Sequence, residues 1–261
     1  MKTRFHSFCA TAAVAVTLGL ISLSTAAAQT QIRIDVEAPG SVALAPSWVQ
    51  FSSTSNAVVQ GGATASAGLE LLAELGDTSG LIGERGGQEI FGPLGTPGGP
   101  TSNSTVVTVN DSDSWFNFAA MILPSNDWFV GTGGVVPELD ITSLLFGATT
   151  GTSVSLNFTD FYDAGTEEED FNFAAPPESF GLADPTLSSP PGGNPDSINT
   201  VRLISGAGNP FSELANPFGD ISSLATNGNP VATVTLTVVP EPGSLVGLLA
   251  IGGLGMLRRR R

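Results

Sequence analysis

The residues best suited to chemistry lie in an acidic stretch at positions 157–173, NFTDFYDAGTEEEDFNF. Six of its seventeen residues are Asp or Glu, although charged residues make up only 13% of the whole chain. Carboxylates at this density predict a solvated loop, an acid–base pair, or an oxygen cage for a hard cation. Asp163 and Glu167 flank Ala164 and Gly165, and the glycine permits a tight turn that points both carboxylates into one concavity.

A further acid, Asp127, stands beside a tryptophan at the end of an expected strand, in ILPSNDWFVG at positions 122–131. Three carboxylates that converge without a cation would repel one another and raise one another's pKa, and a bound cation would resolve that repulsion. Of the other four acids of the stretch, Glu168, Glu169 and Asp170 are interpreted as solvated charges at the rim. Asp160 is a weak candidate, because three residues before Asp163 on a strand it faces the opposite side.

The residue types that are missing exclude several kinds of catalytic site. The only cysteine is Cys9 and the only histidine is His6, and both lie in a segment that we expect to be removed on export. The mature chain would then hold neither residue type. This excludes Ser-His-Asp and Cys-His nucleophiles, the usual zinc ligand sets and any disulfide.

The charge balance narrows the range of partners. Between the expected signal and Glu241 there are 23 acids, three arginines and no lysine, a net charge of −20. A surface of this sign cannot neutralise phosphates, so nucleic acid is excluded as a partner. A cation is the natural partner for such a chain.

The amino-terminal segment 1–28 is typical of a secretory signal peptide. It has a basic start, an apolar run over about residues 10–23, and small residues before an expected cleavage site between Ala28 and Gln29. The protein is therefore expected to be exported.

The carboxyl end combines Pro240, Glu241 and Pro242 with an apolar run and a basic cluster. The run 243–257 would be about 22 Å long as a helix, short of a ~30 Å hydrocarbon core. A tail anchor and a final core helix are the ordinary interpretations. The expected anchor residues are Leu245, Leu248, Leu249, Ile251, Leu254, Leu257, Arg258, Arg259, Arg260 and Arg261.

These three parts, in this order, resemble the PEP-CTERM sorting signal of Gram-negative bacteria. The resemblance implies that the segment 239–261 anchors the chain transiently in the inner membrane. It also implies that an exosortase cleaves near Pro240, Glu241 and Pro242 and delivers the protein to the outer surface or an extracellular matrix.

The body of the chain, residues 31–238, has the length of one large β-sandwich domain. Apolar and polar residues alternate over 32–37, 153–158 and 233–238, which predicts strands, and WFNFAAMIL at 115–123 predicts a strand buried on both faces. A short helix is expected at 66–75, capped by Ser66 and stopped by Gly76, and another is suggested at 137–146. Gly- and Pro-rich segments at 91–104 and 188–195 predict loops.

Two motifs, PSNDWFVG and LNFTDFYDAGTEEEDFNF, resemble the spondin domain of F-spondin, mindin and bacterial homologues, and GLELLAELGDTSGL and VATVTLTV match it in order. The resemblance covers about residues 31–238. It implies an antiparallel β-sandwich with a few short helices and a Ca²⁺ ion held by loops at one end. The implied ligands are Asp127, Asp163 and Glu167, where animal members have aspartate at the last position.

The resemblance favours a non-enzymatic calcium-binding protein of the cell surface or matrix, with a role in adhesion or biofilm. Its partner would be an extracellular matrix component or surface ligand such as an exopolysaccharide. The alternative is an extracellular hydrolase of polysaccharides that uses Asp163 and Asp127 as its carboxylate pair.

Overall fold

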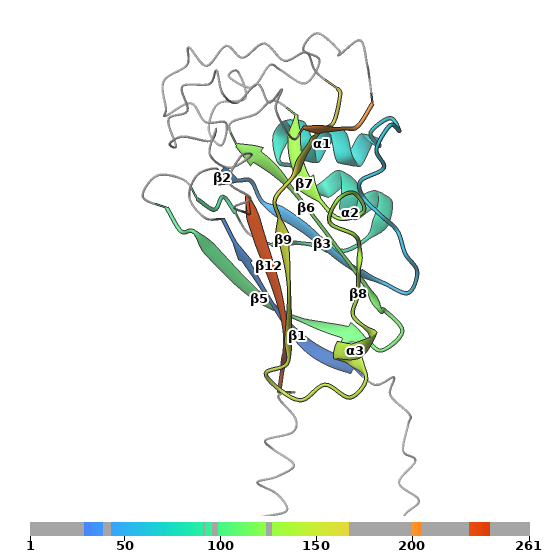
Figure 1. Ribbon diagram of the computed structural model, residues 1–261, viewed down its shortest axis with the longest axis vertical. Coiled ribbons are helices and arrows are strands. Elements are labelled where there is room, and N and C mark those ends of the chain that lie inside the picture. Colours follow the sequence, from blue (N-terminus) through green and yellow to red (C-terminus); the bar gives the residue numbers. More distant parts are fainter. Residues whose placement is uncertain are drawn as a thin grey trace, which may run out of the picture.

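The computed structural model describes residues 29–38, 43–90, 92–95, 99–123, 127–166, 200–204 and 230–240. Two antiparallel sheets pack face to face, and two helices cover the outer face of the larger sheet (Figure 1). The mainly β antiparallel sandwich expected from the sequence is confirmed.

The smaller sheet has four strands in the order β5 (Ser102–Asn110), β1 (Gln29–Glu37), β12 (Ala232–Val239) and β9 (Ser153–Phe158). All three strands predicted from alternation are present in it. Their apolar residues point inward because successive side chains of a strand point to opposite faces. The inward residues include Ile32, Ile34, Val36, Phe158, Val234, Leu236 and Val238, all of which are buried.

The larger sheet has eight strands. Its main path runs β11 (Arg202–Ile204), β10 (Phe161–Asp163), β7 (Trp128–Gly131), β6 (Trp115–Leu123), β3 (Ser47–Ser52) and β4 (Gln88–Ile90). The short strands β2 (Ala43–Leu44) and β8 (Leu139–Asp140) also pair with β6.

Strand β6 is buried on both faces, as its continuous apolar sequence predicts. Phe116 and Phe118 pack in the core between the two sheets, whereas Ala119 packs in the second core beneath the helices. A strand with helices on one side and a sheet on the other has no solvated face, which explains the loss of alternation.

The predicted helix is observed as α1 (Ala67–Leu75). The Leu69 N–H donates to Ser66 Oγ at its start (3.2 Å), and Gly76 ends it with a left-handed φ of 65°. Helix α2 (Ser79–Arg85) was not predicted. It lies against α1 so closely that a side chain at Gly68 would meet the backbone of Gly80 at 2.6 Å.

Two predictions about local structure were wrong. The helix suggested at 137–146 is reduced to α3 (Thr142–Leu145), because residues 139–140 pair with β6 as a strand instead. The loop predicted at 91–104 extends too far, since β5 begins at Ser102 and pairs with β1 along its whole length. In both cases pairing with a neighbouring strand overrides the local preference.

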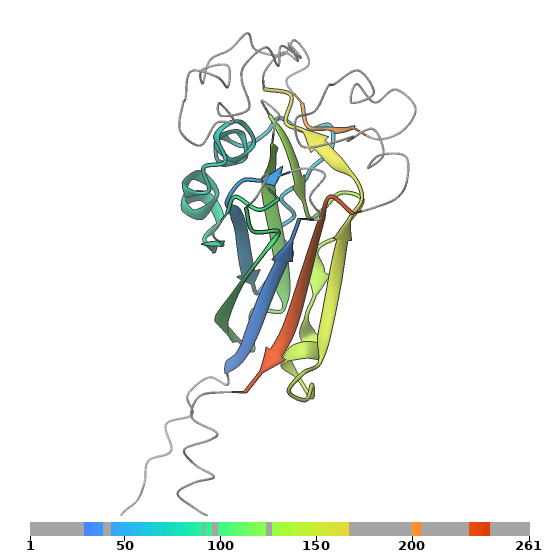
Figure 2. The ribbon, with the colours of Figure 1, turned by 90° about the vertical axis from the view of Figure 1, so that its left-hand side faces the viewer.

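The beginning of β1 and the end of β12 lie together at one end of the sandwich, where Gln31 pairs with Val239. Strands β10 and β11 lie at the opposite end (Figures 1 and 2). The first and last described residues, Gln29 and Pro240, therefore lie far from strand β10, which carries Asp163 of the acidic stretch.

Candidate metal site

The site is built on the pairing of β7 with β10. Asp163 lies opposite Trp128, and Asp127 immediately precedes β7 and accepts the Ala164 N–H on its backbone carbonyl (3.0 Å). The sheet thereby brings two carboxylates that are 36 positions apart in sequence to the same edge. Both side chains are almost fully buried, with 0% of Asp127 and 1% of Asp163 exposed.

Aromatic side chains hold the two strands together beside the acids. The rings of Trp128 and Phe161 lie 5.9 Å apart, and those of Phe129 and Tyr162 lie 5.7 Å apart. Cross-strand aromatic pairs of this kind stabilise a strand pair by about 0.2–1 kcal/mol each. The positions of Asp127 and Asp163 are therefore fixed by well-packed strands.

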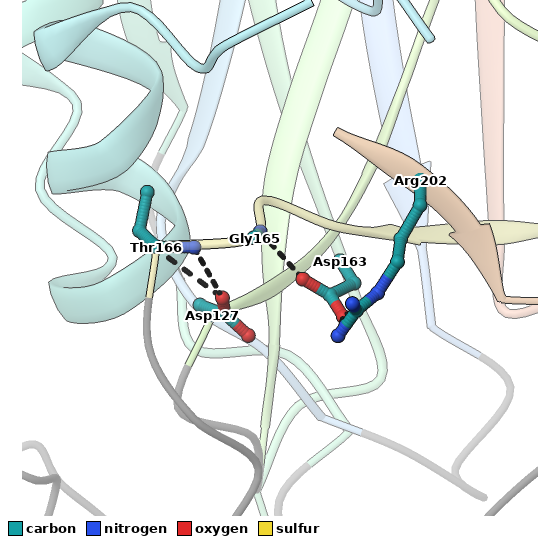
Figure 3. Close-up of polar contacts among 5 residues, drawn as sticks. All are labelled: Asp127, Asp163, Gly165, Thr166 and Arg202. Carbon is teal, nitrogen blue, oxygen red and sulfur yellow. Dashed lines mark hydrogen bonds and ion pairs between the residues drawn. The ribbon is translucent and has the colours of Figure 1, made fainter. Parts of the chain in front are cut away.

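The turn after β10 supplies backbone donors to both carboxylates. The Gly165 N–H donates to Asp163 Oδ1 (2.5 Å), and the Thr166 N–H donates to Asp127 Oδ2 (3.1 Å), with the Thr166 hydroxyl at 3.4 Å from the same oxygen (Figure 3). Gly165 has φ 70°, and a Cβ at this position would lie 2.4 Å from the Thr200 carbonyl oxygen. The tight turn predicted at this glycine is confirmed.

A third charged residue, Arg202, completes the polar contacts and was not predicted. It lies opposite Asp163 on β11, and its Nε donates to Asp163 Oδ2 (2.5 Å), with Nη2 in contact with the same oxygen (Figure 3). The Arg202 side chain is 34% exposed. Arginine is scarce in this chain, with only three between the expected signal and the carboxyl tail. That scarcity was a usable signal that each arginine could be the partner of an acid.

A second residue that sequence reasoning missed is Glu74 on α1. Its side chain is 5% exposed, and burial raises its pKa above the ordinary value. A hydrogen bond with the Thr166 side chain opposes that shift, while the nearby Glu70 carboxylate adds to it. Thr166 therefore contacts two acids, Glu74 and Asp127. Helical periodicity alone assigns Glu74 to no site, so only the packing of α1 on the sheet reveals it.

The structure thus brings together two of the three predicted ligands. Asp127 and Asp163 share the turn at 164–166, whereas Glu167 lies outside the described residues. Within the described ranges, no three Asp, Glu, His or Cys side chains form a group that could hold a metal ion by themselves.

The donor set nevertheless suits a hard cation. Two buried carboxylates stand side by side, and calcium prefers oxygen ligands from carboxylates, carbonyls and water. The Arg202 guanidinium already neutralises part of the carboxylate charge that a bound cation would neutralise. A cation that approached Asp163 would compete with the Arg202 guanidinium for the same carboxylate.

The predicted processing sites fall mainly outside the described part of the chain. Gln29 begins β1 and is exposed, and Pro240 follows β12 and is exposed. Ala28, Glu241, Pro242 and the anchor residues of 245–261 lie beyond the described ranges. Among the helices that are described, none has the length and apolar character needed to cross a bilayer.

Comparison with known proteins yields two family-model matches. A model described as Spondin_N matches residues 49–179, and a model of the PEP-CTERM protein-sorting motif matches residues 238–261. The first match contains both buried acids and the strands that carry them, but leaves out β1 and β12. A search of curated proteins found no match to the chain.

Proposed function

The chain belongs to the Spondin_N family and is an exosortase-sorted surface protein, and we propose that its buried acidic site binds Ca²⁺ and that it serves in adhesion. The observation that carries the proposal is the pair Asp127 and Asp163, two buried carboxylates held side by side where β7 begins and β10 ends. Burying one acid is costly, and burying two in one place is costlier still unless positive charge compensates them.

Calcium fits this donor set in chemistry. Asp127 and Asp163 would supply carboxylate oxygen, and Glu167 is retained from the resemblance as a third ligand. Calcium would contribute a divalent charge that draws these acids and nearby backbone carbonyls together. In this chain the Gly165 and Thr166 N–H groups already hold one oxygen of each acid in place, so the site is organised before any ion enters.

Arg202 sets the condition under which a cation binds. Its side chain is one-third exposed and comes from a three-residue strand with a single described neighbour, β10. Such a side chain can turn toward solvent at modest cost, whereas Asp163 cannot leave the interior. Calcium binding would therefore displace or reorient Arg202, because two cations compete for one carboxylate.

The alternative, hydrolysis by the same acid pair, has weaker support. An acid–base pair requires one carboxyl that gives up a proton. Both carboxyls here accept hydrogen bonds from N–H donors, and Asp163 also accepts from a guanidinium. We therefore propose a binding role and not a catalytic one.

An adhesion role is supported by where the site lies. The carboxyl end, which carries the sorting motif, leaves the sandwich at the end of β12, and the acidic site lies at the opposite end (Figure 1). A protein held at its carboxyl end would present the site away from that surface. This is the orientation that contact with a matrix component requires.

The calcium proposal is tested by thermal unfolding of the exported protein with calcium, with magnesium and with a chelator. A ligand that binds only the folded state stabilises it by about 2.7 kcal/mol at 100 times its Kd. We expect a higher Tm with calcium than with chelator, a weaker response to magnesium, and one ion per chain by isothermal titration calorimetry.

Variants separate a specific site from general attraction to an acidic surface. Asp127→Asn should remove the calcium response, whereas Asp113→Asn, an acid in the turn after β5, should retain it. Equal responses in the two variants, or no response in the unmodified protein, would contradict the proposal and leave Asp163 and Arg202 as a structural ion pair.

The adhesion proposal needs its own measurement. The exported protein should be retained by extracellular matrix prepared from the producing bacterium in the presence of calcium, and released by chelator. Retention that is identical for Asp127→Asn would show that adhesion does not use this site.

A further inference from the structure

Among the described strands, β5 forms an edge of the smaller sheet, and its own sequence carries none of the residues that usually protect an edge strand. It is nine residues long, SNSTVVTVN, with no charged residue and no proline, and β1 is the only described strand that pairs with it. Edge strands of this length are normally blunted by lysine, proline, a bulge or a covering segment, because an open edge accepts another strand.

The absence of charge on β5 contrasts with the rest of the chain. The whole chain carries a net charge of −15, yet the cross-strand contacts from β5 to β1 use amides and hydroxyls, such as Gln31 to Thr108 (3.2 Å). Arg33 on β1 lies opposite Val106 of β5, and its side chain forms an ion pair with Asp35 (2.9 Å). The charges nearest to the centre of the edge thus already neutralise each other.

The sequence of β5 is complementary to itself in the antiparallel direction. With a two-fold axis at its central residue, Val106, all nine residues find a partner: Ser104 faces Thr108 and Ser102 faces Asn110 of the other copy. Val106, which is 50% exposed, faces its own counterpart. No like charges come to lie opposite each other, and an exposed apolar side chain is covered.

We propose that β5 is a self-association edge that pairs with β5 of a second copy of this chain, around a two-fold axis at Val106. The two four-stranded sheets then join into one continuous sheet. The interface is of the isologous kind, in which the same surface is used by both copies and the assembly closes at two. This inference does not depend on calcium or on the acidic site.

Antiparallel pairing has a consequence for how the two copies are oriented. Strands β1, β5 and β12 run along the length of the sandwich, so the second copy is turned end over end (Figures 1 and 2). The two carboxyl ends then emerge at opposite ends of the dimer. Chains held by their carboxyl ends on two facing surfaces can form this pair, and neighbours upright on one surface cannot.

The competing arrangement uses the other edge of the same sheet, β9. Pairing of β5 with β9 of the next copy would keep all copies in one orientation and would not close, giving an open array. Strand β9 has six residues and β5 has nine, so a β5–β9 pair would contain fewer paired residues than a β5–β5 pair. The two arrangements predict different results for single substitutions.

The register is tested by cysteine crosslinking of the exported chain, since the unmodified sequence has no cysteine after Cys9. Directly opposed residues of an antiparallel pair have Cα atoms about 4.5–5.5 Å apart, within the range of roughly 4.4–6.8 Å that a disulfide requires. Val106→Cys should therefore form a covalent dimer under mild oxidation. Ser104→Cys alone and Thr108→Cys alone should not, because each lies about 13 Å from its own counterpart, but a mixture of the two should crosslink.

The strength of the pairing is tested by sedimentation over a range of protein concentrations. Val106→Lys should raise the dimer dissociation constant at least about tenfold, because two like charges would face each other. Thr235→Lys, on the same face but on the interior strand β12, should change it little. Circular dichroism checks that both variants fold.

Three outcomes would overturn the proposal: a monomer at all concentrations, crosslinking by Ser104→Cys alone, or a loss of association in Ser155→Lys on β9. The last of these would indicate the open β5–β9 array.

Discussion

The protein places acidic side chains in two different polar clusters, one whose acid is bonded to neutral donors and one whose acid is paired with a cation. Glu138 accepts hydrogen bonds from the Asn56 N–H (2.5 Å), from Asn117 Nδ2 (2.8 Å) and from the Ser55 hydroxyl. All three donors are neutral. Asp163, in contrast, is matched by the cation Arg202 from a three-residue strand, beside a second buried acid, Asp127.

The two clusters also differ in what surrounds them. Asn117, which is fully buried on the central strand β6, links Glu138 to the Thr132 hydroxyl (2.7 Å), so the first cluster is tied into the middle of the larger sheet. The second lies where β7 begins and β10 ends. A cluster that neutral donors satisfy has no need of an ion, whereas two buried acids beside a partly exposed guanidinium are the arrangement from which the calcium proposal starts.

The largest effect is expected from breaking the structural cluster. Asn117→Ala removes one of the three donors to the Glu138 carboxylate and the side-chain acceptor of the Thr132 hydroxyl. A hydrogen bond to a charged group contributes about 1.5–3 kcal/mol and a neutral one about 0.5–1.5 kcal/mol. We expect the free energy of unfolding to fall by about 3 kcal/mol in a denaturant titration, with the calcium response retained. The exposed amide Asn110→Ala is the control. A lost calcium response in Asn117→Ala would show that the two clusters are coupled.

The next effect is expected from the cluster of Asp127, Asp163 and Arg202. Asp163→Asn should abolish calcium stabilisation, about 2.7 kcal/mol at 100 times the Kd, measured as the Tm difference between calcium and chelator. Glu70→Gln, an exposed acid on α1, should leave that difference unchanged because its charge is screened by solvent and salt. The same decrease in both variants would indicate diffuse attraction of ions.

Arg202→Gln should have a smaller effect, of opposite sign on binding. Removing the competing cation should tighten calcium binding about fivefold, roughly 1 kcal/mol, by titration calorimetry. The chelated variant should unfold at a lower temperature, because Asp163 loses its charged partner. Arg202→Lys keeps the positive charge and should bind calcium close to the unmodified affinity. Unchanged affinity in Arg202→Gln would mean that Arg202 and calcium do not compete.

The smallest effect concerns Glu74, whose pKa burial raises above 4.5, with the Thr166 hydrogen bond opposing the shift and Glu70 adding to it. A raised folded-state pKa contributes stability that is fully present below the unfolded-state value and is lost as pH rises through the folded-state value. With chelator present, Glu74→Gln should therefore lose less stability than the unmodified protein as pH rises from 4.5. Parallel pH profiles for the two proteins would contradict this assignment.

Local patterns predicted the strands of the smaller sheet and the helix α1 with its caps. One face of β1, β9 and β12 is solvated, so apolar and polar residues alternate, and the pattern is visible without knowledge of any partner. Ser66 and Gly76 were recognisable because capping depends on residues within one helical turn. The tight turn at Gly165 belongs to the same class of local feature.

Other elements were missed because their cause is not local. Helix α2 depends on contact with α1, where Glu84 accepts from the Ser66 hydroxyl (2.7 Å) and the Gly68 N–H (2.6 Å). Strand β5 begins in a segment whose composition is typical of loops, and its pairing with β1 overrides that composition. Neither contact can be read from a window of neighbouring residues.

The candidate site divides in the same way. The sequence by itself determined the acids available, the scarcity of cations, the turn at Gly165 and the two family resemblances, because these depend on residue type and short-range spacing. Only the tertiary structure decided that Asp127 and Asp163 are buried side by side, that Arg202 opposes Asp163 across β10 and β11, and that Glu74 approaches Thr166 from α1. The physical reason is that each of these contacts joins segments tens of residues apart, whose register is set by the burial of the sheet's apolar face.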